Sequence, residues 1–84
     1  MIEIDVKAIE SQEDFYKLLN EKLDFDYYVE NLDALFDQLI YSYPKLRIVN
    51  YKYLYKNLGD YGKRLMEVFL DSVRMYDIDI DFIS

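Results

Sequence analysis

The chain has no cysteine and no histidine, and its 84 residues include only two glycines and one proline. Without cysteine there is no disulfide framework and no thiolate chemistry. Without cysteine and histidine, the common nucleophilic triads and soft-metal sites are excluded. The sequence also lacks a glycine-rich phosphate loop. Carboxylates and tyrosines remain as the groups available for chemistry or binding, and we expect no cofactor.

Long apolar runs are also absent from the sequence. No segment approaches the ~20 consecutive apolar residues that a membrane-spanning helix requires. Residues 2–6 alternate apolar with acidic side chains directly after Met1, so the basic and apolar regions of a signal peptide are missing. We therefore expect a cytoplasmic protein, and its length predicts a single domain over residues 1–84.

Positive charge is missing from the middle of the chain. Residues 23–44 hold five acids and no base, whereas residues 45–64 hold six bases against one acid. The net charge of the whole chain is −7, which argues against nucleic acid and anionic membranes as direct ligands. An acidic segment of this kind favours a strongly basic protein partner.

Hydrophobic periodicity predicts three strands. Residues 2–6 and 77–82 alternate apolar with charged side chains, as half-buried strands do. Residues 46–50 form a weaker third candidate between them.

Helical patterns separate these strands. Ser11 is the expected N-cap of a first helix, and Asn31 is the expected N-cap of a second helix that ends before Pro44. A short helical turn over residues 53–58 and a long helix over about residues 62–76 follow.

This order of elements predicts an α/β fold of two layers, in which helical crossovers connect a three-stranded parallel sheet. Because the strands alternate instead of being apolar throughout, we expect the helices to pack on one face and solvent to cover the other. Glu3, Asp5, Asp79 and Asp81 would share that open face. A central second strand would place Arg47 among these acids, which favours the strand order 1-2-3.

Asp33 and Asp37 are the carboxylates that the pattern singles out. Four residues apart on a helix, they are separated by about 40° around the axis and project from one face, and Tyr41 extends their ridge by one turn. Like charges at this spacing destabilise a helix by about 0.2–0.5 kcal/mol, and the macrodipole disfavours Asp37 in the second half of the helix. Local penalties that a sequence retains often mark a functional site.

Other interpretations of this pair stay open at this point. The first is that the two aspartates are ordinary solvated surface. The second is that they are the acid and the nucleophile of a glycosidase, and the third is that they bind a hard metal ion. The last two require a cleft, which one exposed helix face in a small domain rarely provides. Tyr27, Tyr28 and Tyr41 flank the pair, and tyrosine is enriched at binding hot spots. Packing at the helix entry is the alternative role for Tyr27 and Tyr28.

The run from Tyr27 to Leu39 resembles the signature of barstar-like proteins, which inhibit small microbial ribonucleases. The resemblance rests on the pattern Tyr-Tyr-x-Glu-Asn-Leu-Asp-Ala-Leu-aromatic-Asp-x-Leu. It continues at Tyr43-Pro44, at Val68-Phe69 and in the closing segment from Asp79 to Ser84, so that it spans nearly the whole chain. It implies the barstar-like fold, a three-stranded parallel sheet with helices packed on it, in agreement with the periodicity.

The resemblance also implies a mechanism. The helix at about residues 31–41 and the turn before it would block the active site of a small basic ribonuclease, with carboxylates standing where a substrate phosphate binds. Asp37 would reach the catalytic centre, and Asp33 would be the second electrostatic contact. The resemblance also implies Tyr27, Asn31, Phe36 and Asp71 as partner-binding residues. We expect Val29 and Tyr41, in or beside the same segment, to contact the partner as well.

We therefore expect an immunity protein, monomeric when free, that inhibits a cationic ribonuclease by occlusion and is not itself an enzyme. Val29, Phe36 and Tyr41 stand where the family usually has a glycine, a tryptophan and a small residue, so we expect them to bear on the choice of partner. The alternative is an acidic interaction module of barstar-like fold whose partner is not a nuclease. A small carboxylate enzyme, the third hypothesis, requires a cleft around Asp33 and Asp37. We expect no small-molecule substrate.

Overall fold

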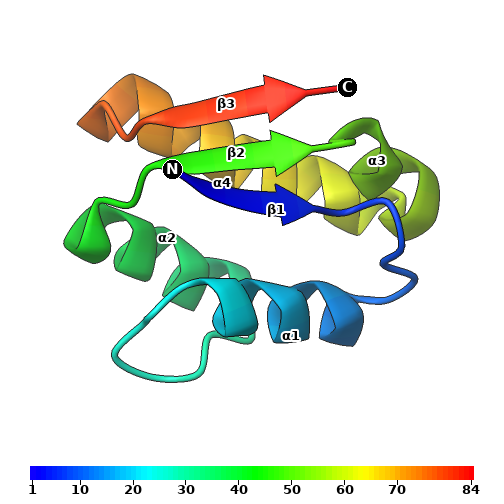
Figure 1. Ribbon diagram of the computed structural model, residues 1–84, viewed down its shortest axis with the longest axis horizontal. Helices are drawn as coiled ribbons and strands as arrows, with labels where there is room; N and C mark the ends of the chain where they lie inside the picture. Colours follow the sequence, from blue (N-terminus) through cyan, green and yellow to red (C-terminus); the bar gives the residue numbers. More distant parts are fainter.

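The computed structural model describes all residues, 1–84, as three strands and four helices. The strands form one parallel sheet in the order β1-β2-β3, with the helices gathered on one side of it (Figure 1). The predicted α/β class, parallel pairing and strand order are therefore confirmed. None of the helices has both the length and the apolar character needed to cross a membrane. The elements in chain order are β1 (Ile2–Asp5), α1 (Gln12–Lys22), α2 (Leu32–Ser42), β2 (Leu46–Val49), α3 (Lys52–Leu58), α4 (Asp60–Tyr76) and β3 (Ile80–Ile83).

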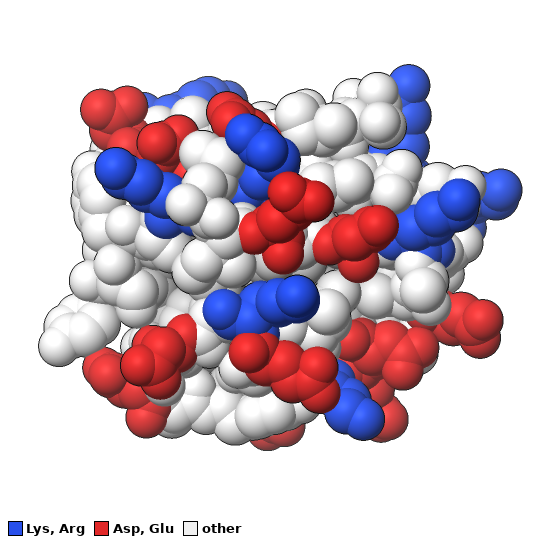
Figure 2. Space-filling model, in the orientation of Figure 1, with Lys and Arg blue, Asp and Glu red and all other residues white.

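The open face of the sheet carries the charged half of each alternating strand. The strand register places Arg47 beside Glu3 on one side and beside Asp81 on the other. The Arg47 Nη1 atom lies 3.8 Å from a Glu3 carboxylate oxygen. Acidic and basic side chains are accordingly interspersed over the face seen in Figure 2. Asp79 is exposed as expected, but it lies just before β3 begins.

The covered face of the sheet forms the core together with the helices. Ile4 and Ile48 are neighbours in the register and are both fully buried. The buried rings of Phe15 on α1 and Phe69 on α4 meet edge to face, with centroids 6.3 Å apart. Burial of each such side chain contributes about 1.5–3 kcal/mol, so this packing fixes the helices against the sheet. Leu35 of α2 is fully buried in the same core, so the outer face of α2 has a defined orientation.

The last helix begins two residues earlier than the predicted start near residue 62. Gly59 adopts a positive φ of 57° between α3 and α4, which allows the chain to turn sharply and restart a helix at Asp60. Gly62 then lies in the first turn of α4, where α3 approaches closely. A Cβ at Gly62 would lie 1.9 Å from the Leu54 carbonyl oxygen, so only glycine fits there.

The last strand begins later than the alternation from residue 77 predicted. Asp77 caps α4 in the left-handed conformation, with φ 58°, and its N–H donates to the Val73 carbonyl at 3.0 Å. Pairing with β2 therefore starts only at Ile80. The second strand likewise ends at Val49, because Asn50 has φ 60°. These boundaries depend on left-handed residues that interrupt an otherwise continuous pattern.

Candidate functional site

Helix α2 has a well-defined start and end. The backbone of Asn31 is extended, and its Oδ1 accepts the Ala34 N–H at 2.8 Å, as predicted for an N-cap. The side chains of Leu35 and Leu39 are buried against the rest of the protein. At the other end, Tyr43 adopts the left-handed conformation and donates its N–H to the Leu39 carbonyl at 3.0 Å. The opposite face of α2 is thereby held outward.

Asp33 and Asp37 occupy that outward face, and both are exposed. The two ion pairs of the structure join Arg47 to Glu3 and Arg74 to Asp71, so neither involves α2. The helix thus carries two like charges one turn apart without a counter-charge from the protein itself. A surface of this kind can accept hydrogen bonds from arginine or lysine without first breaking an internal pair.

Aromatic side chains flank this acidic ridge. Tyr27 is 50% exposed and Tyr41 is 74% exposed, and each projects an apolar ring with a polar hydroxyl. Phe36 is half-buried, with its ring edge to face on Tyr76 of α4 at a centroid distance of 6.0 Å. We call the group of exposed and half-buried residues on α2 and the turn before it the acidic helix surface; it comprises Tyr27, Asn31, Asp33, Phe36, Asp37 and Tyr41.

Val29 is one of two predicted contacts that lie outside this surface; the other is Asp71, on α4. The side chain of Val29 is fully buried in the core. Its N–H donates to Asn20 Oδ1 at 2.9 Å, and its carbonyl accepts from Asn20 Nδ2 at 2.7 Å. Val29 therefore holds the turn in place instead of facing outward. Its expected role changes from contact to positioning, because the valine side chain, which stands where the family usually has a glycine, packs in the core.

Asn20 and Gln38 are positioning residues that the sequence patterns did not single out. Asn20 on α1 forms hydrogen bonds with both the N–H and the carbonyl of Val29. Its Nδ2 also donates to the Tyr16 carbonyl at 2.6 Å. Gln38 is a buried residue of α2 whose Oε1 accepts the Asp26 N–H at 3.3 Å. The sequence feature that could have identified these two residues is a polar side chain at a helical position that faces the interior of the protein. Between them, these two amides fix the segment that leads into α2.

Asp71 differs from the two aspartates of α2. It lies on α4, is partly exposed, and pairs with Arg74 one turn further along the helix. Its charge is thus already compensated within the protein. A partner that used Asp71 would have to compete with that guanidinium.

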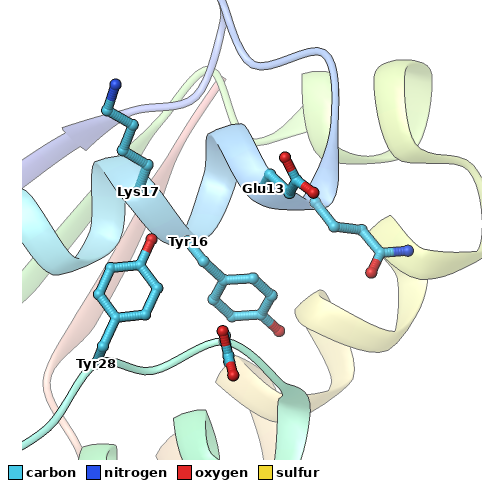
Figure 3. Close-up of a pocket in the computed structure, with 6 residues that line it drawn as sticks. Glu13, Tyr16, Lys17 and Tyr28 are labelled. Atoms are coloured by element: carbon cyan, nitrogen blue, oxygen red, sulfur yellow. The ribbon is translucent and has the colours of Figure 1, made fainter.

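Two hollows mark the surface, and neither is lined by Asp33 or Asp37. The larger, about 490 Å³, lies between α1 and the segment before α2, as Figure 3 shows. The smaller, about 320 Å³, lies beside α1 and the end of β1. No group of three or more carboxylates is arranged to hold a metal ion. The cleft that the enzyme hypothesis requires does not form around the aspartate pair.

Comparison with known protein families matches residues 1–82 to the family described as Barstar (barnase inhibitor). The match covers all but the last two residues and confirms the resemblance found in the sequence. The three parallel strands and four helices agree with that fold. No curated protein and no solved structure matches the chain.

Proposed function

The chain belongs to the barstar family of barnase inhibitors, and on that premise we propose that it inhibits a small basic ribonuclease by covering the enzyme's active site. The acidic helix surface makes the contact, with α2 entering the substrate cleft and the turn at Tyr27 packing on its rim. The protein acts by occlusion and leaves the chemistry of the enzyme unchanged.

The observation that carries this proposal is the uncompensated pair Asp33 and Asp37. A ribonuclease must hold RNA phosphates, so its active site presents arginine, lysine or protonated histidine. Carboxylate oxygens accept the same hydrogen bonds as phosphate oxygens do. Asp37 stands where a substrate phosphate binds, and Asp33 provides the second charged contact.

The charge distribution also supports rapid association. The net charge of −7 attracts a basic enzyme over long range, and residues 23–44 contribute five acids without a base. Complementary charge raises association rates more than it raises affinity. Fast capture suits an immunity protein, because a ribonuclease must be blocked before it degrades the RNA of the producing cell.

The rigidity of the surface is a further support. Asn31 caps α2, and Asn20 and Gln38 hold the preceding turn by side-chain to backbone hydrogen bonds. A surface that is already ordered loses little conformational entropy on binding. Tight inhibition can therefore come from few contacts.

An inhibition assay against a panel of small basic ribonucleases tests the proposal. We expect stoichiometric inhibition of at least one enzyme and loss of inhibition in the double variant Asp33→Asn, Asp37→Asn. The matched control is Glu3→Gln, Asp81→Asn on the sheet, which removes the same charge and should inhibit as well as the unchanged protein. Absence of inhibition across the panel, with a non-nuclease protein captured at low salt and released at high salt, would favour the interaction-module hypothesis instead.

A further inference from the structure

The larger hollow lies beside the acidic helix surface and is not part of it. It is a groove of about 490 Å³ between α1 and the segment that leads into α2. Glu30, at one side of the groove, immediately precedes Asn31, the N-cap of α2. The groove therefore ends where the acidic helix surface begins. Its lining residues are Gln12, Glu13, Tyr16, Lys17, Tyr28 and Glu30.

The two walls of the groove are held at a fixed spacing. One wall is α1, and the other is the chain on either side of Val29. Asn20 of α1 bonds both the N–H and the carbonyl of Val29, at 2.9 and 2.7 Å, between the two lining residues Tyr28 and Glu30. The groove is thus formed before any ligand arrives.

The floor of the groove is a buried, uncharged phenol. Tyr16 is 3% exposed, and its hydroxyl lies 2.5 Å from that of Tyr61. Burial, and then the bond to Tyr61, raise the pKa of Tyr16 above its usual value. The floor is therefore uncharged, and because Tyr16 is almost wholly buried and its hydroxyl is paired with Tyr61, it is the ring of Tyr28 that a ligand in the groove can reach.

The groups around this floor favour a planar cation. Glu13 on α1 and Glu30 on the opposite wall bring carboxylates from two sides, and neither is in an ion pair. Tyr28 adds a second ring, more than half exposed. The one cation in the lining is Lys17, and Figure 3 shows its side chain directed away from the rings of Tyr16 and Tyr28.

A guanidinium group matches this arrangement better than an ammonium group does. Its plane stacks on tyrosine rings, and its five N–H donors can reach acceptors on both walls at once. An ammonium is a compact point charge that cannot stack in this way. An anion would meet two carboxylates.

We propose that this groove binds a guanidinium group, namely an arginine side chain of the protein partner. The chemistry of the groove is independent of the proposed function, but the source of the guanidinium rests on it. A basic ribonuclease that presents an arginine beside its active site would fill the groove while α2 covers the catalytic centre. The groove would then discriminate among ribonucleases that share the same catalytic residues.

The first experiment tests the groove in the free protein. The capped amino acid N-acetyl-arginine methylamide is titrated at constant ionic strength and followed by amide chemical shifts. The lysine analogue tests the need for a plane, and the citrulline analogue, which has the same shape without the charge, tests the need for a cation. We expect saturable shifts at Tyr28 and Glu30 with arginine, weaker ones with lysine and none with citrulline. Equal shifts with citrulline would overturn the assignment.

Variants locate the interaction within the groove. Glu13→Gln and Glu30→Gln should each weaken arginine binding by about 1.5- to 5-fold, the range for an exposed ion pair. Glu67→Gln, an equal charge change at an exposed site on α4, should leave it unchanged. Tyr28→Ala keeps every charge and should abolish the preference for arginine over lysine. If Glu67→Gln weakened arginine binding as much as the groove variants do, the binding would reflect general charge attraction, and the assignment of the groove would be overturned.

The second experiment tests the source of the guanidinium in a complex with an inhibited ribonuclease. Each arginine around the enzyme's active site is replaced by lysine, alone and together with Glu30→Gln of the inhibitor. One arginine should show a combined loss smaller than the sum of the separate losses, since both changes remove the same contact. Additive losses for every arginine would overturn the partner assignment. If no ribonuclease is inhibited at all, the proposed function fails, while the titration still decides whether the groove takes a guanidinium.

Discussion

On the open face of the sheet, Glu3 and Asp81 flank Arg47 in neighbouring strands, whereas on the outer face of α2, Asp33 and Asp37 lie one turn apart without a base. Both faces are exposed and both carry acids. On the sheet, Arg47 forms an ion pair with Glu3 and lies beside Asp81 in the register, so a base stands between the acids of the two outer strands. This arrangement suits a surface that stays in solvent and resists edge-to-edge association.

On the helix, Asp33 and Asp37 form no ion pair, although like charges one turn apart mildly destabilise the helix. Exposed tyrosines flank it, and buried amides hold its turn in place. An acidic face is therefore not by itself evidence of a binding site. The two faces differ in whether the protein itself supplies a base beside its acids.

The largest effect is expected from Asp37→Ala. If this carboxylate meets cations in the active site of an inhibited ribonuclease, its removal leaves those cations buried and unpaired, at a cost of about 2–5 kcal/mol. The dissociation constant would rise by about 30-fold to several thousand-fold, measured by competition calorimetry. The barnase–barstar pair is itself among the measured systems behind that range. Glu3→Ala on the sheet is the control, and equal losses for the two variants would remove the distinction between the faces.

The second prediction concerns the support of the acidic helix surface. Asn20→Ala leaves the N–H and carbonyl of Val29 without their partners, so the free energy of unfolding should fall by about 1–3 kcal/mol. Urea denaturation measures this loss. Gln12→Ala, an exposed position on the same helix, should change it by less than about 0.5 kcal/mol. A stability unchanged in Asn20→Ala would show that the turn is held by other means.

Salt dependence gives the third prediction. The association rate with an inhibited ribonuclease should fall on the order of tenfold between low and high salt, because mobile ions screen the long-range attraction. In stopped-flow measurements, the variant Asp33→Asn, Asp37→Asn should show a shallower dependence than the variant Glu3→Gln, Asp81→Asn, although both have the same net charge. Identical slopes would mean that total charge, and not its placement on α2, guides the encounter.

The smallest effect is expected on the sheet side, at Asp5. The side-chain amide of Asn50, and next the backbone N–H of Lys7, hydrogen-bond to its carboxylate and lower its pKa below the ordinary 3.8. The folded state favours the ionised form, so this stabilisation is present above the ordinary pKa and is lost as the pH falls through the lowered one. Asp5→Asn, which keeps an oxygen acceptor, should therefore lose less stability than the unchanged protein between about pH 5 and pH 2. Parallel pH profiles of the two unfolding midpoints would contradict this role.

The sequence was sufficient to predict features that depend on local pattern. Asn31 was expected to cap α2 because its side chain needs only the backbone N–H three residues away, and it does so. Arg47 suggested a central second strand because acids dominate the other two, and the register agrees. The exposure of Asp33 and Asp37 followed from the helical period alone.

Features that depend on contacts between distant segments were not predictable. Val29 looked like a surface substitution, but its side chain fills the core, and the partner that holds its backbone lies nine residues earlier, on α1. The early start of α4 depends on Gly59, whose positive φ lets the chain restart a helix directly after α3. The left-handed Asp77 delays β3 because it caps a helix. For Val29 a tertiary contact overrode the local pattern, whereas Gly59 and Asp77 shift the element boundaries through positive-φ backbone, which hydrophobic periodicity does not reveal.

Cross-saturation NMR on the complex with an inhibited ribonuclease is the decisive test of whether α2 meets the partner, because it identifies the residues in contact with the enzyme. We expect intensity losses along residues 27–41, strongest around Asp33 and Asp37, and none at Glu3, Arg47 or Asp81. Losses centred on the open face of the sheet, with α2 unaffected, would contradict it.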